Sequence, residues 1–311
     1  MNSQISRRGI LFGAAAMVCG GRVVVADAAA SVAKVDGGDV EAGKLAISGL
    51  GNAADRIAAL EKRAGGRLGV EALDTASGRR IQHRSDERFG MCSTFKFLAA
   101  AAVLQRVDRG AEHLDRRIEY SQSDLLEYAP VTKEHIKDGG MALADICAAA
   151  VQWSDNTAAN LMLRVLGGPE AVTAFIRSTG DNVTRLDNTE PKLNVVRPGE
   201  IHDTTTAASM VGLLNSVVLG QVLSADSRTR LQGWMLDAKV GAHRLPAGLP
   251  TGWRIAHKTG TGSDQTNDVG VVWPPNQSPI IVAVLYSRSG TRQQQREDVL
   301  RDVARIVAAG F

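Results

Sequence analysis

The chain has 311 residues, of which 44% are hydrophobic and 22% are charged, and its formal net charge is +3. This composition is ordinary for a soluble globular protein, and the length suffices for a full hydrophobic core in one or two domains. Without residues 1–28 the chain carries 33 basic and 32 acidic side chains, a balance that gives no electrostatic basis for binding nucleic acid or an anionic membrane surface.

The first 28 residues have the composition of an export signal. Residues 6–12 (Ser-Arg-Arg-Gly-Ile-Leu-Phe) form a twin-arginine pattern that leads into an apolar, alanine-rich stretch. Gly20 and Gly21 interrupt that stretch, so it is too short for a transmembrane helix, and Ala28 ends a small-x-small cleavage site. We therefore expect a twin-arginine signal peptide over residues 1–28 and a periplasmic mature protein with no membrane anchor.

The three cysteines bear on this expectation and on the redox state of the mature chain. The alternatives to a cleaved signal are a membrane anchor and a lipoprotein attached at Cys19, but Ala-Met-Val before that cysteine is a poor context for lipidation. Cys92 and Cys147 remain after cleavage, and an even number in an exported protein permits one disulfide. Because Cys147 lies in a separate apolar helical run, we expect two free, buried thiols instead.

Hydrophobic periodicity predicts strands near both ends of the chain and helices between them. A flexible, Gly- and Ala-rich lead-in is expected over residues 29–52, and one folded domain over 53–311. The expected elements are a helix over 53–63, strands over 67–75 and 79–83, helices over 95–104, 142–151 and 156–166, strands over 253–261, 267–273 and 280–286, and a helix over 293–308. This order predicts an α+β fold, an antiparallel sheet interrupted by a helical insertion.

The first candidate for chemistry is Ser93-Thr94-Phe95-Lys96, which places a hydroxyl and an amine three residues apart on one helix face. A serine at a helix N-terminus lies near free backbone N–H groups, and a lysine in a mostly apolar helix should have a lowered pKa. Alone this signal is weak, because Ser-x-x-Lys should occur about once by chance in a chain of this length. Ser31 and Lys34 repeat the spacing, but only Ser93 begins an apolar helix.

Two further motifs lie later in the chain, and each also has a purely structural explanation. Ser154-Asp155-Asn156 precedes a predicted helix, where these residue types are the best N-caps. Lys258-Thr259-Gly260 ends a predicted strand, where a lysine can simply face solvent before a glycine turn.

Together the three motifs change the interpretation. S-x-x-K, S-D-N and K-T-G in this order resemble the set found in class A serine β-lactamases and penicillin-binding proteins. The resemblance covers the chain from about residue 53 to its end. It implies a five-stranded antiparallel sheet flanked by helices, formed by residues 53–90 and 251–311, and an all-helical part over 91–250, with the active site between them. It also implies action on a β-lactam without a cofactor. A monomer is expected by default, because the sequence gives no evidence of an obligate interface.

The resemblance assigns roles residue by residue. Ser93 would be the nucleophile, Lys96 its partner in proton transfer, and Ser154 the donor of a proton to the β-lactam nitrogen. Asn156 would bind the substrate's side-chain amide, and Tyr128 would form an aromatic wall at the mouth. The substrate carboxylate would be bound by Lys258, Thr259, Gly260 and Thr261, with Arg244 in the place of an arginine that some members supply.

The long irregular segment over residues 182–203 distinguishes between the classes. Glu190-Pro191-Lys192-Leu193-Asn194 resembles the Ω-loop of class A enzymes, which carries E-P-x-L-N. A carboxylate and an amide four residues apart can hold one water against an acyl ester, so Glu190 would be the general base and Asn194 its partner. The alternative is an ordinary solvated glutamate before a proline. Glu190-Pro191 is also a candidate cis peptide bond.

Three positions depart from the family pattern. Asn188 replaces an arginine that usually pairs with an aspartate, here Asp203, which predicts a looser Ω-loop and easier entry of bulky cephalosporins. His257 stands where aspartate is usual, and it is expected to influence the site through its neighbours rather than to take part in catalysis. Gly262 replaces a cysteine that carbapenem-hydrolysing relatives bridge to the position of Cys92, which lowers the expectation of carbapenemase activity.

Other functions stay open as alternatives at this point. A penicillin-binding D-Ala-D-Ala peptidase would share the three motifs, although Glu190 and Asn194 argue against it. A non-turnover β-lactam sensor, which is acylated and stays blocked, is the alternative from another class. The six histidines show no close ligand spacing, so no metal is expected and a zinc-dependent lactamase is disfavoured.

Overall fold

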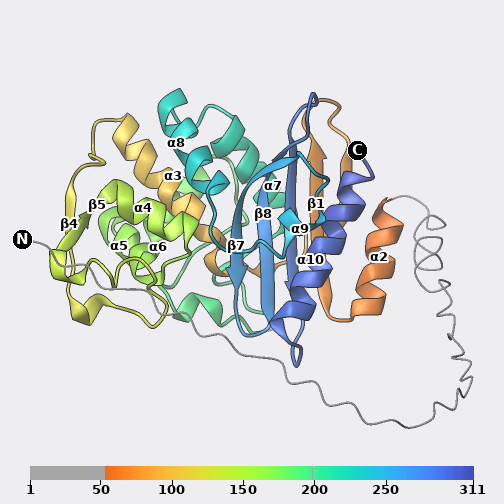
Figure 1. Cartoon of the computed structure of the whole chain (residues 1–311), viewed down its shortest axis with the longest axis horizontal. Helices are drawn as coiled ribbons and strands as arrows, with labels where there is room; N and C mark the ends of the chain where they lie inside the picture. The colour runs from red at the N-terminus through yellow and green to blue at the C-terminus, as the bar shows by residue number, and fades with distance from the viewer. Residues whose placement is uncertain (1–52, 198) are drawn as a thin grey trace, which may run out of the picture. The chain divides into compact units, whose positions relative to one another are not determined.

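The computed structural model describes residues 53–197 and 199–311. Within these residues the central feature is a five-stranded antiparallel sheet in the order β2-β1-β9-β8-β7 (Figure 1). Its strands are β1 (Arg67–Asp74), β2 (Arg80–His83), β7 (Arg254–Thr261), β8 (Gln265–Trp273) and β9 (Ile280–Ser287). Each strand agrees with its predicted range to within two residues, and the predicted α+β fold is confirmed.

The sheet is covered on both faces, which explains why its central strand β9 is apolar from Ile280 to Leu285. In β9, Ile281, Ala283 and Leu285 pack into the core on the side of the helical part. The alternate residues Val282 and Val284 pack into a second core, because successive side chains of a strand point to opposite faces. That second core lies under α2 (Ala53–Ala64) and α10 (Gln293–Ala308), which cover one face of the sheet in Figure 1.

The segment between β2 and β7 is mainly helical, as expected. It contains α3 (Phe95–Asp108), α4 (Leu143–Gln152), α5 (Asn156–Leu166), α6 (Pro169–Ser178), α7 (Ala207–Leu214), α8 (Ala225–Leu236) and the short α9 (Leu245–Gly248). Every residue of α3 from Phe95 to Leu104 is buried, so this helix is the centre of the helical part.

Short strand pairs that the hydrophobic pattern did not indicate interrupt the helices. They are β3 (Phe89–Gly90) with β6 (Thr204–Thr205), and β4 (Arg117–Glu119) with β5 (Gly140–Ala142). Two- and three-residue strands are too short to show a period. The first pair matters for the site, because it joins the segment before Ser93 to the end of the Ω-loop (residues 182–203).

Two predictions fall on residues that the structure does not describe: the signal peptide over 1–28 and the lead-in over 29–52. In the described part of the chain, no helix combines the length and hydropathy needed to cross a bilayer.

Candidate active site

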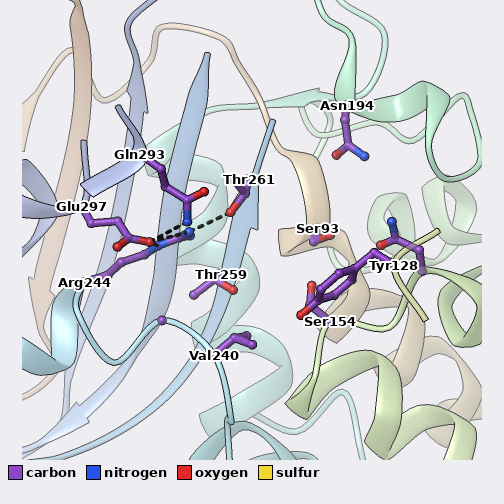
Figure 2. Close-up of a pocket in the computed structure, with 12 residues that line it drawn as sticks. Ser93, Tyr128, Ser154, Asn194, Val240, Arg244, Thr259, Thr261, Gln293 and Glu297 are labelled. Atoms are coloured by element: carbon purple, nitrogen blue, oxygen red, sulfur yellow. Dashed lines mark hydrogen bonds and ion pairs between the residues drawn. The ribbon is translucent and has the colours of Figure 1, made fainter. Parts of the chain in front are cut away.

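A cavity of about 400 Å³ opens between β7 and the helical part, and Figure 2 shows the side chains around it. Eight of the sequence-predicted residues line it: Ser93, Tyr128, Ser154, Asn156, Asn194, Arg244, Thr259 and Thr261. Four lining residues were not predicted: Val240, Gly241, Gln293 and Glu297. The three motifs and the Ω-loop, far apart in the sequence, therefore meet at one site.

Ser93 is held in a tight turn rather than in the helix proper. A 3-10 turn spans Cys92–Thr94 and α3 begins at Phe95, so the prediction that Ser93 itself opens the helix was off by one turn. Cys92 has φ of +46°, a strained conformation for a residue with a side chain and one that often marks functional sites.

Gly260 lets this turn approach strand β7. A Cβ at position 260 would lie 2.7 Å from the carbonyl oxygen of Met91, so a larger residue would push the turn away. Asn267 of β8 donates hydrogen bonds from Nδ2 to the carbonyl oxygens of Gly90 and Met91. The glycine of the K-T-G motif and a buried asparagine thus fix Ser93 against the sheet.

The side chains of Ser93 and Lys96 both contact the same carboxylate oxygen of Glu190. Ser93 Oγ donates to Glu190 Oε1 at 3.1 Å, and Lys96 Nζ lies 2.9 Å from the same atom. The side chains of Lys96 and Glu190 are fully buried. Burial lowers the pKa of Lys96, and the neighbouring Glu190 carboxylate opposes this shift.

Lys96 also ties the nucleophile to the S-D-N motif. Its Nζ donates to the carbonyl oxygen of Ser154 at 2.8 Å and to Oδ1 of Asn156 at 2.6 Å. Because Oδ1 of Asn156 is occupied, its Nδ2 group is the part that can face a substrate. Asp155 caps α5 by accepting from the N–H of Ala158, so the capping explanation of this motif holds for its middle residue.

Glu190 is positioned by two asparagines. Asn194 Nδ2 donates to Glu190 Oε2 at 2.6 Å. Asn160 of α5 accepts from the backbone N–H of Glu190 at 2.9 Å and donates to its carbonyl oxygen at 3.0 Å. Asn160 was missed by sequence reasoning, although it lies four residues after Asn156 on the same helix face. The Glu190–Pro191 peptide bond is cis, as predicted.

A second buried lysine faces Ser154 from the strand side. Lys258 Nζ donates to Ser154 Oγ and to the carbonyl oxygen of Thr259, both at 2.9 Å. Burial lowers the pKa of Lys258 well below its usual range, and the charges of Lys96 and Arg244 add to this shift. Because Ser154 Oγ accepts from Lys258, its own O–H is free to donate.

Arg244 is held rigidly at the edge of the cavity. Its Nε donates to Glu297 Oε1 at 3.2 Å, and NH1 donates to the carbonyl oxygens of Gly260 and Asn267 at 3.0 and 2.8 Å. NH2 donates to Thr261 Oγ1 at 2.7 Å. Gln293 and Glu297, one turn apart on α10, are hydrogen-bonded at 2.9 Å, and Figure 2 shows both beside the guanidinium.

Tyr128 lies at the mouth, as predicted. It is 47% exposed, lines the cavity, and its hydroxyl donates to the carbonyl oxygen of Trp153 at 3.2 Å. This bond links the aromatic ring to the residue directly before Ser154.

Two of the three departures from the family pattern, at Asn188 and Gly262, have contacts of their own. Asn188 Nδ2 donates to Asp203 Oδ2 at 2.6 Å, so a hydrogen bond remains where the charge pair is missing. Within the described part of the chain, Cys92 and Cys147 are buried free thiols, as predicted. A Cβ at Gly262 would lie 3.2 Å from Cys92 Sγ.

Comparisons with known proteins agree with this geometry. The model of the β-lactamase enzyme family matches residues 52–311. β-Lactamase L2 of Stenotrophomonas maltophilia is 50% identical over 257 residues, which cover 82% of this chain and 84% of that protein. β-Lactamase CTX-M-8 of Citrobacter amalonaticus is 45% identical over 257 residues, covering 82% and 88%.

A solved structure extends the agreement to the fold. The last common ancestor of Gram-negative bacteria class A β-lactamase (GNCA4) is 56% identical, with a TM-score of 0.82 over 83% of this chain and 99% of that chain. With the predicted motifs assembled around one cavity, the chain belongs to the class A β-lactamase family.

Proposed function

We propose that this protein hydrolyses the β-lactam ring of penicillins and cephalosporins through an ester on Ser93, and that it confers resistance on its host. The observation that carries the proposal is the meeting of Ser93 Oγ and Lys96 Nζ on one oxygen of Glu190, whose other oxygen is held by Asn194. Similarity to named β-lactamases over most of their length supports it.

In the acylation half, Ser93 Oγ attacks the lactam carbonyl carbon and gives up its proton to the Lys96–Glu190 pair. The backbone N–H groups of Ser93 and Thr261 stabilise the oxyanion. As the C–N bond breaks, Ser154 donates its proton to the ring nitrogen, and Lys258, which is hydrogen-bonded to Ser154 Oγ, favours that transfer. Ser154 then recovers a proton from the Lys96–Glu190 pair, which leaves Glu190 ionised for the second half. The product is an ester between the opened lactam and Ser93.

In the deacylation half, a water molecule attacks the ester carbonyl and gives its proton to Glu190. Asn194 Oδ1 is buried and has no hydrogen-bond partner among the described residues. It can therefore accept one proton of that water while Glu190 accepts the other. The ester bond then breaks, the opened acid leaves, and Ser93 Oγ takes the proton back from Glu190, with which it is hydrogen-bonded in the free enzyme.

The substrate carboxylate is bound beside β7. Thr261 Oγ1 accepts from Arg244, so its O–H is free to donate to an anion. Thr259 lines the same wall, while Lys258 lies beneath it and donates to the carbonyl oxygen of Thr259. Asn156 Nδ2 and Tyr128 would contact the acyl side chain.

Turnover separates this function from the two alternatives, a D-Ala-D-Ala peptidase and a β-lactam sensor. After excess penicillin is added, the intact mass should return to the free value within seconds of the drug being consumed. A sample quenched rapidly during turnover should carry the adduct on the peptide that contains Ser93. A persistent adduct on the native protein would instead support a peptidase or sensor.

For the substrate range, we propose penicillins and cephalosporins ahead of carbapenems, because Gly262 cannot form the cysteine bridge to Cys92. Side-by-side hydrolysis of a penicillin, an oxyimino-cephalosporin and a carbapenem tests this ranking. Comparable turnover of the carbapenem would contradict it.

For location and assembly, we propose twin-arginine export to the periplasm and a monomeric mature enzyme. Conversion of Arg7 and Arg8 to lysine should leave activity in the cytoplasmic fraction, and light scattering of the mature protein should give the monomer mass. Normal export of the double variant, or a dimer mass, would contradict the respective proposal.

A further inference from the structure

We infer that His257 and Asp268 form a buried positioning pair that holds the turn carrying Arg244, and so tune recognition of the substrate carboxylate. This inference rests on the proposed function, because it concerns the carboxylate pocket. Neither residue lines the cavity, so any influence on substrate must act through their neighbours.

The pair is closed to solvent and well defined. His257 Nδ1 lies 2.8 Å from Asp268 Oδ1, and the two side chains are 6% and 0% exposed. Because a carboxylate accepts but does not donate, the imidazole donates from Nδ1. Gly270 lies opposite His257 in the ladder, and a Cβ there would lie 2.9 Å from His257 Cβ. The absence of a side chain at position 270 therefore leaves room for the Cβ of His257.

The pair reaches the Arg244 turn at two points. The second oxygen of Asp268 accepts from the backbone N–H of Leu245 at 3.2 Å, which fixes the chain directly after Arg244. At the other end of the turn, His257 packs against Gly241, where a Cβ would lie 3.2 Å from His257 Cε1. The N–H of Arg244 donates to the carbonyl oxygen of Gly241 at 2.9 Å, which closes the turn between these two supports.

The position of this turn decides where the guanidinium points. Arg244 donates to Thr261 Oγ1 at 2.7 Å, and this bond leaves the hydroxyl proton of Thr261 available for the substrate. Residues 257, 259 and 261 share one face of β7 because strand side chains alternate. One side of the strand thus carries the His257–Asp268 pair, the carboxylate-binding threonines and Arg244. A small displacement of the turn would move the guanidinium of Arg244 and, with it, the hydroxyl of Thr261 that donates to the substrate.

The test uses two reversible probes that both bond to Ser93. Phenylboronic acid has no carboxylate, whereas its meta-carboxy derivative offers one to the Thr259–Thr261 wall. Wild type should bind the carboxylated probe more tightly. His257→Leu, which removes the donor while keeping most of the volume, should weaken that probe by about tenfold and the plain one by less than about twofold.

Two further variants make the result independent of one substitution. His257→Asn retains an N–H donor near the Nδ1 position and should restore most of the preference. Asp268→Asn keeps the shape but leaves one acceptor oxygen for two donors, so it should reduce the preference as His257→Leu does. For penicillin, His257→Leu and Asp268→Asn should raise KM more than they lower kcat, and His257→Asn should restore most of the wild-type KM. The matched control is His83→Leu, which removes another imidazole–carboxylate contact, with Glu61, far from β7 in the sheet order.

The outcomes separate the claims. Equal weakening of both probes in His257→Leu, or an unchanged preference, overturns the positioning role even if wild type hydrolyses penicillin normally. Absence of a preference in the wild type contradicts the carboxylate pocket itself. A wild type that fails to hydrolyse penicillin contradicts the proposed function.

Discussion

At the scale of single residues, the contact between Lys96 and Glu190 is the feature that the stability of the fold explains least well. Both side chains are fully buried, with Nζ and Oε1 2.9 Å apart, and the desolvation of two ions offsets much of their attraction. Hydrophobic residues of similar size would fill the same space without that cost. The pair is better explained by its part in the reaction, because burial lowers the pKa of Lys96 and Glu190 faces the nucleophile.

Replacing Asn194 with leucine tests the amide's part in deacylation. The substitution keeps the volume but removes the donor to Glu190 Oε2 and the buried acceptor Oδ1. We expect kcat for a penicillin to fall by about 100-fold, the size of effect seen on removing one aligned polar group, with slow deacylation in single-turnover kinetics. Lys192→Ala, on the same turn but exposed, serves as the control, and equal effects of the two variants would contradict the assignment.

Among the elements, the Ω-loop is the one whose shape controls the site. Its last residue is held against residues 187 and 188 because Asp203 Oδ1 accepts from the backbone N–H groups of Asp187 and Asn188, at 2.8 and 2.9 Å. Asn188 Nδ2 adds a bond to Oδ2, but no charge neutralises this buried carboxylate from position 188. The loop is therefore held at Asp203 by backbone and amide hydrogen bonds, without an ion pair from position 188.

Asn188→Arg restores the missing charge. We expect the melting temperature to rise by about 2–4 °C, which corresponds to about 1 kcal/mol for a domain of this size, and kcat/KM for an oxyimino-cephalosporin to fall relative to that for a penicillin. Calorimetry and paired hydrolysis assays measure these changes. Unchanged stability together with an unchanged substrate ratio would show that the asparagine has no such effect.

The packing of α2 against the sheet makes a pH-dependent contribution through Glu61. Burial raises the pKa of this carboxyl, but hydrogen bonds from the Leu68 N–H, Arg84 and His83 outweigh burial and lower it overall. A carboxyl with a lowered folded-state pKa stabilises the fold above its unfolded pKa, and this contribution is lost as the pH falls through the folded pKa.

Glu61→Gln should therefore destabilise the protein at pH 7 by about 1–2 kcal/mol, the range for hydrogen bonds to a charged group. The difference from wild type should shrink steadily as the pH falls below about 4.5, the unfolded value. Urea unfolding at several pH values measures it. A difference that stays constant down to acid pH would show that the charge of Glu61 is not responsible.

At the level of the whole molecule, the features with a strong local sequence pattern were the ones that could be predicted. The apolar run of α3, the capped start of α5 at Asn156 and the alternating strands were found at or near their true bounds. The two-residue strands β3 and β6 were not, because their pairing depends on contacts between distant segments. The same reason explains the misses in the site: Asn160 and Glu297 carry no motif, and only the fold brings them to Glu190 and Arg244.

The burial of Cys92 and Cys147 in a core that unfolds cooperatively predicts how the two thiols react. Burial raises the pKa of Cys92 to about 12, with the Glu190 charge adding to the shift, and burial also raises that of Cys147. Both should resist a thiol reagent in the native mature protein and react together on unfolding in denaturant. Rapid labelling of either cysteine at neutral pH without denaturant would show that the core opens locally.

The measurement that bears most directly on the central claim is the fate of the ester on Ser93 when Glu190 becomes glutamine. Glu190→Gln keeps the size of the side chain and its contact with Asn194 but removes the base. Intact-mass spectrometry after adding benzylpenicillin should show wild type returning to its free mass, while the variant acylates and retains the adduct for minutes to hours. If the variant cleared its adduct as fast as wild type, Glu190 could not be the group that delivers water to the ester.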